Sequence, residues 1–479
     1  MVASDTVGER RLGWIYAVLG AAAIVEYFEL NMMYVLLPRL YETFGSPAQV
    51  GWAVTAFSLV GAAAVAVGGR IGDVIGHRRM LIVALAASAV GSFVSATATD
   101  LWQLIAGRAI QGTAAIILPM AISLLRALVS STDRQKFGTG VIAGVGYSAA
   151  GVAPLTAGLL VGTWDWHAVF LVSGGLAVIV MVLAFLLPDD RRSGGSWGQI
   201  DLVGAVTLIP GIVLLLLGIT RIASAGLGRP LTIGLLVAGA LVLAGWGAYE
   251  RRQPNPVIDL KLFRNPGFAV SCLSFALYSL TLGAAILLSL VGQNPVSAGG
   301  FGMTPALFGG FMLLLVVAGT IMNVVGGWMS VRIGCRATLV VGAIVQMIGY
   351  GVVGVFLIST DARALWMFPI VLLSGLGNGI VNAVLPAFVS ESVPVEKSGM
   401  ALGIQQVIKM ATQAVGQQVV AALLIVFPLV AAVAGGPATI PSQASIVLIY
   451  FATVVVSLLI VPVALLAPVR RQASAEVAA

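Results

Sequence analysis

The chain has 479 residues, of which 59% are hydrophobic and only 9% are charged, and its mean hydropathy is +1.06. A soluble domain carries about 25% charged residues, so this composition excludes a soluble globular protein. It also excludes a disordered chain, which needs low hydrophobicity and high charge. The apolar runs are about 20 residues long, the length of a membrane-spanning helix. We therefore expect an all-α polytopic membrane protein rather than a β-barrel, which shows short alternating segments.

Apolar runs of spanning length predict fourteen transmembrane helices. Their expected ranges are 12–37, 48–69, 79–98, 101–125, 137–161, 167–187, 201–220, 230–249, 267–291, 305–328, 337–359, 365–390, 399–426 and 444–467. An even number of spans places both termini on one side of the membrane. No stretch between the spans is long enough for a soluble domain, so we expect the protein to act within the membrane.

The distribution of basic residues predicts which side the termini face. Nineteen Lys and Arg residues fall on the termini and on the connections of the same side. The opposite side holds four, which are Arg39, Arg221, Arg229 and Arg363. Since cytoplasmic segments carry the excess of Lys and Arg, we expect both termini in the cytoplasm. The net charge of +7 then reflects topology, and we expect no nucleic-acid partner.

Two similar loops indicate an internal repeat. The loop after the second span and the loop after the tenth align at a fixed offset, with Gly76 matching Gly334 and Arg78 matching Arg336. Spans one to six and nine to fourteen then form equivalent halves, with two helices inserted between them. The expected domains are 12–187, 201–249 and 267–467. Internal repeats are typical of transporters, which bind substrate at the repeat interface.

Four motifs carry a resemblance to a known family. They are Gly69-x-x-x-Asp73-x-x-Gly76-His77-Arg78-Arg79, Leu104-x-x-x-Arg108-x-x-Gln111-Gly112, the segment from Glu29 to Pro38, and the set Gly140, Pro154 and Gly158. In these motifs the chain resembles the major facilitator superfamily and, within it, the fourteen-span drug:proton antiporter branch. The chain departs from the pattern at Glu29, where Asp is usual, and at Ala149, Ala153 and Ala157, where Gly is usual.

The resemblance implies a transporter, not an enzyme, that exports small amphipathic drugs or natural products by proton antiport with alternating access. It implies a multi-pass protein of a bacterial cytoplasmic membrane. It also implies a conformational switch, formed by Gly69, Asp73, Gly76, Arg78, Arg79, Pro154 and Gly158. In the second loop Val331 stands where Asp73 does, so only the first loop has the full switch.

Four charged residues lie deep in the predicted spans, namely Glu26, Glu29, Arg108 and Lys409. A charge at mid-bilayer costs about 2.5 kcal/mol or more unless it is paired or wet, so each is a candidate functional residue. Glu29 and Arg108 are each about 12–14 Å from the outer ends of their spans, which would let them pair. Glu26 has no such partner in its own half, which makes it a candidate proton carrier with Glu29 close behind. A static ion pair that only fixes packing is the alternative.

The thirteenth span carries a polar stripe. Its members fall within about 140° of one helix face, and they are Gln405, Gln406, Lys409, Thr412, Gln413 and Gln417. Such a stripe cannot face lipid, so it lines a substrate cavity or bonds to a neighbouring helix. Lys409 could pair with Glu26 across the cavity or bind an anionic group of a substrate.

Asn378 and Asn382, four residues apart on the twelfth span, could also line the cavity or bond to a neighbour. An adaptable apolar wall could form from aromatic residues and methionines, although any membrane bundle contains such residues. The candidates are Phe57, Tyr147, Phe275, Tyr278 and Met322.

The sequence contains no cluster of metal ligands and no phosphate-binding loop, so we expect no metal and no cofactor. The expected partners are a small-molecule substrate, protons and the lipid bilayer, and we expect a monomer. Two alternatives remain open. One is a transporter of an organic anion or metabolite with Lys409 as counter-charge, and the other is a passive channel or a membrane scaffold without transport activity.

Overall fold

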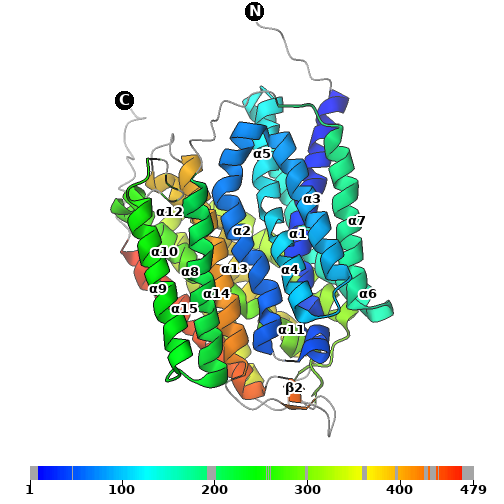
Figure 1. The fold of residues 1–479 in the computed structure, drawn as a ribbon, viewed down its shortest axis with the longest axis vertical. Coiled ribbons are helices and arrows are strands. Elements are labelled where there is room, and N and C mark those ends of the chain that lie inside the picture. The colour runs from blue at the N-terminus through cyan, green and yellow to red at the C-terminus, as the bar shows by residue number, and fades with distance from the viewer. Residues whose placement is uncertain are drawn as a thin grey trace, which may run out of the picture.

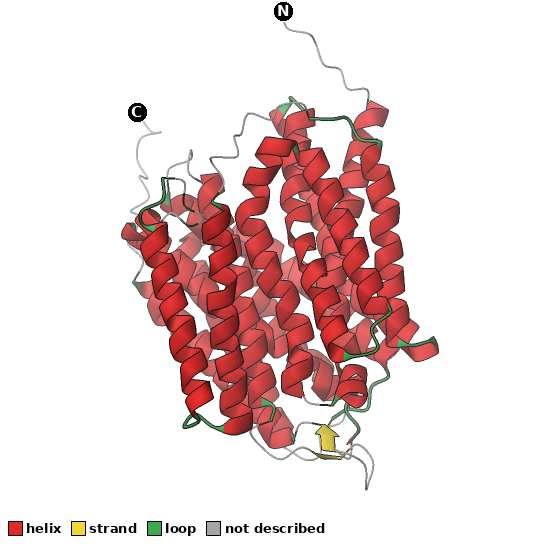
Figure 2. Cartoon of the chain, in the orientation of Figure 1, coloured by secondary structure: helices red, strands yellow, loops and turns green. Residues whose placement is uncertain are grey.

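A computed structural model describes residues 9–45, 47–190, 201–254, 256, 258, 260–296, 300–358, 364–393, 398–425, 430–431, 438–440 and 442–466. This part of the chain is almost entirely helical (Figure 2). The exception is a short ribbon between the last two helices, in which β1 (Val430–Ala431) pairs antiparallel with β2 (Ala438–Ile440). The fold is therefore all-α, as the apolar runs predict.

A helix occupies each of the fourteen predicted ranges. In chain order the helices are α1 (Glu9–Phe44), α2 (Pro47–Ile75), α3 (His77–Ala96), α4 (Leu101–Gln111), α5 (Ile117–Leu128), α6 (Thr132–Thr163), α7 (Trp166–Phe185), α8 (Leu202–Ala225), α9 (Pro230–Glu250), α10 (Pro266–Thr281), α11 (Ala285–Gln293), α12 (Pro305–Ile358), α13 (Ala364–Ser392), α14 (Ser398–Leu423) and α15 (Gln443–Leu465). Two predicted spans are interrupted by 3₁₀ turns, η1 (Gly112–Ile116) between α4 and α5 and η4 (Leu282–Ala284) between α10 and α11. A third 3₁₀ turn, η3 (Leu260–Arg264), precedes α10.

Among the described residues, eleven helices are long and apolar enough to cross a membrane. One of them is α12, which bends at Gly334 and covers two predicted spans. The apolar stretch of α8, Val206–Ile222, is shorter than those of the eleven helices. The helix α14 is not among the eleven, because its composition is too polar. The polar stripe explains why α14 is too polar to be counted. Its glutamines lower the mean hydropathy of a helix that nonetheless lies inside the bundle. The number of crossings therefore stays a prediction.

The bundle has two ends, which we name by their contents (Figure 1). The Gly76 end holds the start of α1 and the bends at Gly76 and Gly334, and the ribbon end holds β1 and β2. Gly76 and Gly334 both have positive φ, +98° and +82°, which glycine adopts at little cost. The two residues that the sequence repeat aligns thus share a backbone conformation.

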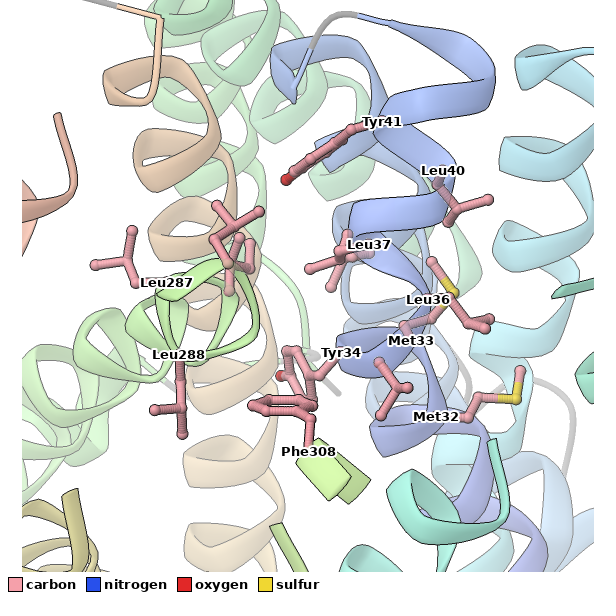
Figure 3. Close-up of a cluster of buried hydrophobic side chains, with 14 of the residues drawn as sticks. Met32, Met33, Tyr34, Leu36, Leu37, Leu40, Tyr41, Leu287, Leu288 and Phe308 are labelled. Atoms are coloured by element: carbon pink, nitrogen blue, oxygen red, sulfur yellow. The ribbon is translucent and has the colours of Figure 1, made fainter. Parts of the chain in front are cut away.

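The apolar core consists of several clusters. At the ribbon end one cluster joins α1, with Met33 and Leu37, to α11 and α12, with Leu287 and Phe308 (Figure 3). A second cluster lies within α1–α7 and a third within α10–α15, which we call the two sets of helices. A fourth cluster joins α2 to α8, α10, α13 and α14. Apolar packing therefore joins the two sets of helices both at the ribbon end and along α2 and α14.

Two lateral seams also join these sets of helices. Along one seam α6 packs on α12, and along the other α2 packs on α14. The pair α8 and α9 pack on each other, and α8 also contacts α2 and α14, so the pair covers the second seam from outside (Figure 1). This arrangement fits two inserted helices beside two halves, although the division into three domains stays a prediction.

Candidate transport site

Glu29 lies fully buried among α1, α3, α4 and α7. Its Oε1 atom accepts hydrogen bonds from Ser88 at 2.7 Å, Ser92 at 2.9 Å, Ser173 at 3.2 Å and the Gln111 amide at 3.2 Å. Its Oε2 atom is buried and has no hydrogen-bond partner within the part of the chain that the structure describes. One oxygen is thus held by four neutral donors, while the other is free to carry a proton.

Arg108 is also fully buried, close to Glu29, but it does not bond to the Glu29 carboxylate. Its guanidinium donates to the backbone oxygens of Ala53 and Glu29, both at 3.1 Å, and to the Gln111 side chain at 2.9 Å. It also lies 4.5 Å from the ring centroid of Phe57, within cation–π range. The expected pair is therefore adjacent, but Gln111 bridges it instead of a direct ion pair.

Glu26 sits at the break in the fourth predicted span. Its carboxylate accepts the backbone N–H of Leu118 at 2.8 Å, in the first turn of α5 just after η1. A carboxylate is stabilised at a helix N-terminus by the exposed N–H groups and the helix dipole. On the other side, Lys409 of α14 is near enough for the two charges to attract, without a direct ion pair. Glu26 thus lies between a broken helix and a cation of the other set of helices.

One member of the polar stripe of α14, Gln417, bonds across the seam with α2. Gln417 accepts from Ser58 at 3.0 Å, and the neighbouring Gln418 accepts from Thr55 at 3.1 Å. The Thr412 hydroxyl bonds to its own helix at Ile408. Other members lie buried or half-buried, namely Gln405, Gln406, Lys409 and Gln413.

A cavity of about 230 Å³ lies between the two sets of helices, and Asn378 and Asn382 line it. Asn378 accepts from Gln346 at 2.9 Å and donates to the Tyr350 hydroxyl at 3.2 Å. Asn382 donates to Asn323 at 3.3 Å. Both asparagines therefore border open space and also bond to neighbouring helices. None of Glu26, Glu29, Arg108 and Lys409 lines this cavity.

In the aromatic group that the sequence suggests as an apolar wall, Tyr147 and Tyr278 line the cavity. The other three, Phe57, Phe275 and Met322, do not. The wall is therefore more tyrosine-rich than the sequence interpretation suggests.

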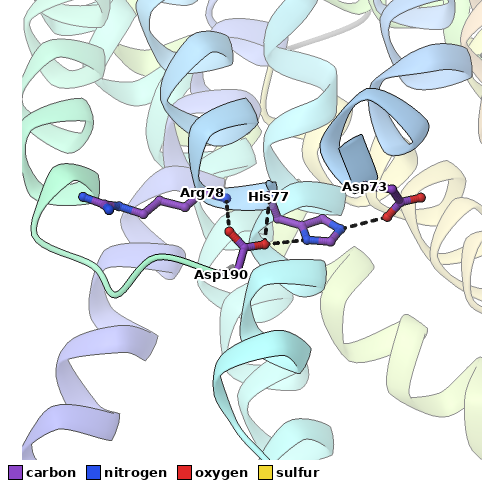
Figure 4. A network of polar contacts seen from close by, with 4 residues as sticks. All are labelled: Asp73, His77, Arg78 and Asp190. Atoms are coloured by element: carbon purple, nitrogen blue, oxygen red, sulfur yellow. Dashed lines mark hydrogen bonds and ion pairs between the residues drawn. The ribbon is translucent and has the colours of Figure 1, made fainter. Parts of the chain in front are cut away.

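The loop motif is organised by a residue outside it, Asp190 (Figure 4). The Asp190 carboxylate accepts the backbone N–H groups of His77 at 2.8 Å and Arg78 at 3.1 Å, and it contacts His77 Nδ1 at 2.7 Å. His77 Nε2 lies 3.2 Å from Asp73, so the imidazole bridges two carboxylates. Asp73 thus contacts His77 within the motif.

The remaining switch residues take different roles. The Arg78 guanidinium donates to the backbone oxygens of Ala184 and Phe185 at the end of α7, which ties α3 to α7. Arg79 lies 3.6 Å from Asp189, and both side chains are exposed enough for solvent to weaken that pair. At Gly69 there is open space where a side chain would extend.

Pro154 and Gly158 lie on α6 where it crosses α12. A Cβ atom at Gly158 would be 2.1 Å from the backbone oxygen of Pro305, and one at Gly309 would be 2.4 Å from the backbone oxygen of Pro154. The two helices therefore touch backbone to backbone near the ribbon end. This close approach requires glycine at both positions.

Sequence reasoning missed several residues of this site. The serines around Glu29 gave no signal, because Ser is common in membrane helices as a neutral hydrogen-bonding residue. Asp190 is more than a hundred residues from the loop that it caps. Its position as an acid just beyond the end of a span was the one signal in the sequence that could have marked it.

Comparisons with known proteins support this picture. The Major Facilitator Superfamily model matches residues 19–417. The puromycin resistance protein pur8 of Streptomyces alboniger is 30% identical over 52% of this chain and 49% of its own length, so that match spans about half of the relative. A probable triacylglyceride transporter of Mycobacterium bovis is 31% identical over 77% of this chain and 73% of its own length.

Two further matches extend over most of the chain. The cephamycin export protein CmcT of Amycolatopsis lactamdurans is 28% identical over 79% of this chain and 78% of its own length. In fold, the chain is similar to the nucleoside transporter NupG, with a TM-score of 0.65, 14% identity, and coverage of 94% of this chain and 99% of that one.

The helical bundle with its long apolar helices is that of a multi-pass membrane protein. The chain belongs to the major facilitator superfamily, whose members are transporters and not enzymes. Its place is the cell membrane.

Proposed function

We propose that this protein exports small amphipathic organic compounds in exchange for protons, by alternating access. Two of its relatives carry names that refer to antibiotic resistance or export, puromycin for one and cephamycin for the other. The proposal extends that activity to this chain and adds the proton as the driving ion.

The proposed coupling rests on the position of Glu26, whose carboxylate accepts the Leu118 N–H at the start of α5, with Lys409 of α14 close enough for the two charges to interact. A proton on Glu26 would remove that attraction and weaken the cap on α5. A ligand shifts a conformational equilibrium only through its different affinity for the two states. The loss of this attraction would therefore allow proton binding to shift the equilibrium between the two access states. Glu29 is the second candidate carrier, since its Oε2 atom has no partner.

The proposed topology assigns the two ends of the bundle. With fourteen spans and both termini cytoplasmic, the ribbon end faces outward, and the apolar cluster there is a closed outer gate. Reporter fusions at the C-terminus and in the loop 292–304 test this assignment. Signals from opposite sides are expected, and signals from the same side would contradict it.

The experiment that tests the function is transport into inverted membrane vesicles, with and without an imposed pH gradient, for cationic, neutral and anionic compounds. Antiport predicts uptake that rises with an acidic interior and vanishes when a protonophore collapses the gradient. Flux that is linear in concentration and indifferent to the gradient would indicate a channel, and no flux would indicate a scaffold.

A double substitution tests the role of the charge pair. Glu26→Gln and Lys409→Gln should each reduce gradient-driven transport of every substrate, and the double variant should lose less than the two effects combined. If Lys409 instead serves an anionic substrate, then Lys409→Gln should impair anions and spare cations. Independent, fully additive losses would contradict the proposed pair.

Lipid export is a second candidate function. It is favoured by the mycobacterial triacylglyceride transporter, whose match extends over about three quarters of both chains. Uptake of a fluorescent triacylglyceride into the same vesicles distinguishes it from export of small compounds.

A further inference from the structure

The cavity between the two sets of helices is built mostly by one of them. Its lining comes chiefly from α10–α13 and α15, and helices α1–α7 contribute only Asn31, Tyr34, Tyr147 and Ala150. Several lining residues also belong to the apolar cluster at the ribbon end, so the cavity lies directly against that cluster. We call this space the tyrosine pocket, after its lining residues Tyr34, Tyr147, Tyr278, Tyr350 and Tyr450.

Among the described residues, none that lines the tyrosine pocket is charged. The four deep charges all lie elsewhere, at the α1–α4 cluster and on α14. A charged ligand would therefore lose its hydration without gaining a counter-charge, which costs several kcal/mol for an ion that stays unpaired. The lining thus favours an uncharged ligand.

The tyrosine rings provide flat, rigid walls. Tyr350 and Tyr450 have ring centroids 6.3 Å apart, Tyr278 is stacked on Phe275 at 6.1 Å, and Tyr147 meets Tyr27 edge to face at 5.9 Å. Aromatic rings pack best against other flat ring systems. At about 230 Å³ the pocket is smaller than the usual ligand site of about 300–1,000 Å³, so it fits one ring system, alone or as the end of a larger molecule.

The tyrosine hydroxyl groups that line the pocket differ in their hydrogen bonding. The Tyr350 hydroxyl is held by Asn378, which Gln346 braces in turn. Tyr278 and Tyr450 also line the pocket, and no hydrogen bond of their hydroxyls is found within the described residues. A phenolic hydroxyl can donate one hydrogen bond, so each is available to an acceptor oxygen on a ligand.

We infer that the tyrosine pocket recognises an uncharged, flat ring system that bears carbonyl or ether oxygens. The ring lies between tyrosine faces, and its oxygens accept hydrogen bonds from Tyr278 and Tyr450. This inference rests on the proposed function, because it names the substrate class of the same transporter. Aromatic walls also attract organic cations, so a cationic ligand is the rival that the test must exclude.

The test compares three probes with one fluorescent core and different charge. They are 7-methoxycoumarin, its 4-acetate and its 4-(trimethylammonio)methyl derivative, each titrated into the purified full-length protein in lipid nanodiscs without a pH gradient. The neutral probe should bind at least tenfold more tightly than either ion. Tighter binding of the cation or the anion would overturn the inference, as would no binding of the neutral probe up to millimolar concentration.

Three Tyr→Phe variants locate the binding. Tyr278→Phe and Tyr450→Phe keep the rings and remove the free hydroxyls, so each should weaken binding of the neutral probe about three- to tenfold. Tyr41→Phe is the matched control, because its hydroxyl has no hydrogen-bond partner within the described residues either, and it lies outside the pocket. It should leave the affinity unchanged. Equal effects in all three variants, or none in the first two, would contradict the assignment.

The failure of this inference can be told apart from failure of the proposed function. If the neutral probe binds in a way that depends on the two tyrosines but no gradient-driven flux is seen, proton antiport is contradicted and the pocket assignment stands. If gradient-driven flux is seen and is the same in Tyr278→Phe and Tyr450→Phe, the pocket assignment is contradicted and proton antiport stands.

Discussion

The Asp190 carboxylate bonds to His77 twice, at the backbone N–H at 2.8 Å and at the imidazole Nδ1 at 2.7 Å. A residue beyond the end of α7 therefore caps the first turn of α3 and orients the imidazole that meets Asp73. The loop motif is locked to the helices of its own half by this contact.

Replacing Asp190 tests the cap. Asp190→Ala removes the acceptor of two backbone N–H groups at the start of α3, and loss of a helix cap costs about 0.5–2 kcal/mol. We expect a lower thermal unfolding midpoint in detergent. Asp189→Ala is the control, because Asp189 makes only a long, partly exposed contact with Arg79 and should change little. Equal midpoints for the two variants would contradict the cap.

Replacing Glu29 tests its role as a proton carrier. Glu29→Gln keeps an oxygen that can accept from the surrounding serines, so the protein should fold and reach the membrane. It cannot take up a proton, so gradient-driven transport should fall at least tenfold while downhill exchange persists. Ser173→Ala, which removes the long 3.2 Å contact, should retain coupling. Undiminished uphill transport by Glu29→Gln would exclude Glu29 as an essential carrier.

A glycine-to-alanine substitution, which adds one methyl group, tests whether transport requires the close contact of α6 and α12. Gly158→Ala places a Cβ atom where the Pro305 oxygen lies 2.1 Å away, so the helices must separate at the ribbon end. We expect loss of transport and greater labelling of a cysteine introduced near that end. Gly162→Ala, on the same helix with no atom within 4 Å, is the control and should behave as the parent protein. Normal transport by Gly158→Ala would show that the close contact is dispensable.

The charge preference of the tyrosine pocket should be reversible. Met312 lines the pocket, and Met312→Glu supplies the counter-charge that it lacks. The cationic coumarin should then bind about tenfold more tightly, a gain of about 1.4 kcal/mol. Met312→Gln matches the size without the charge and should not show this gain. An identical response of the two variants would indicate that charge does not govern selection there.

The sequence predicted the helices well, because spanning length and apolar composition determine them locally. It also aligned Gly76 with Gly334, and both residues have positive φ, which favours glycine. What it could not predict are contacts between distant segments. Ser88 and Ser173 meet at Glu29 only after α3 and α7 pack on α1, and five tyrosines from five helices converge only in the folded bundle.

The uncharged tyrosine pocket lies apart from the buried acids, and this separation has an evolutionary consequence. Substitutions in α10–α13 and α15 that reshape the pocket leave Glu26, Glu29, Arg108 and Lys409 unchanged. If these charged residues couple transport as proposed, the ligand preference of the pocket can change without alteration of the coupling residues. Such modularity would let one scaffold diversify into transporters for unrelated cargoes at low mutational risk.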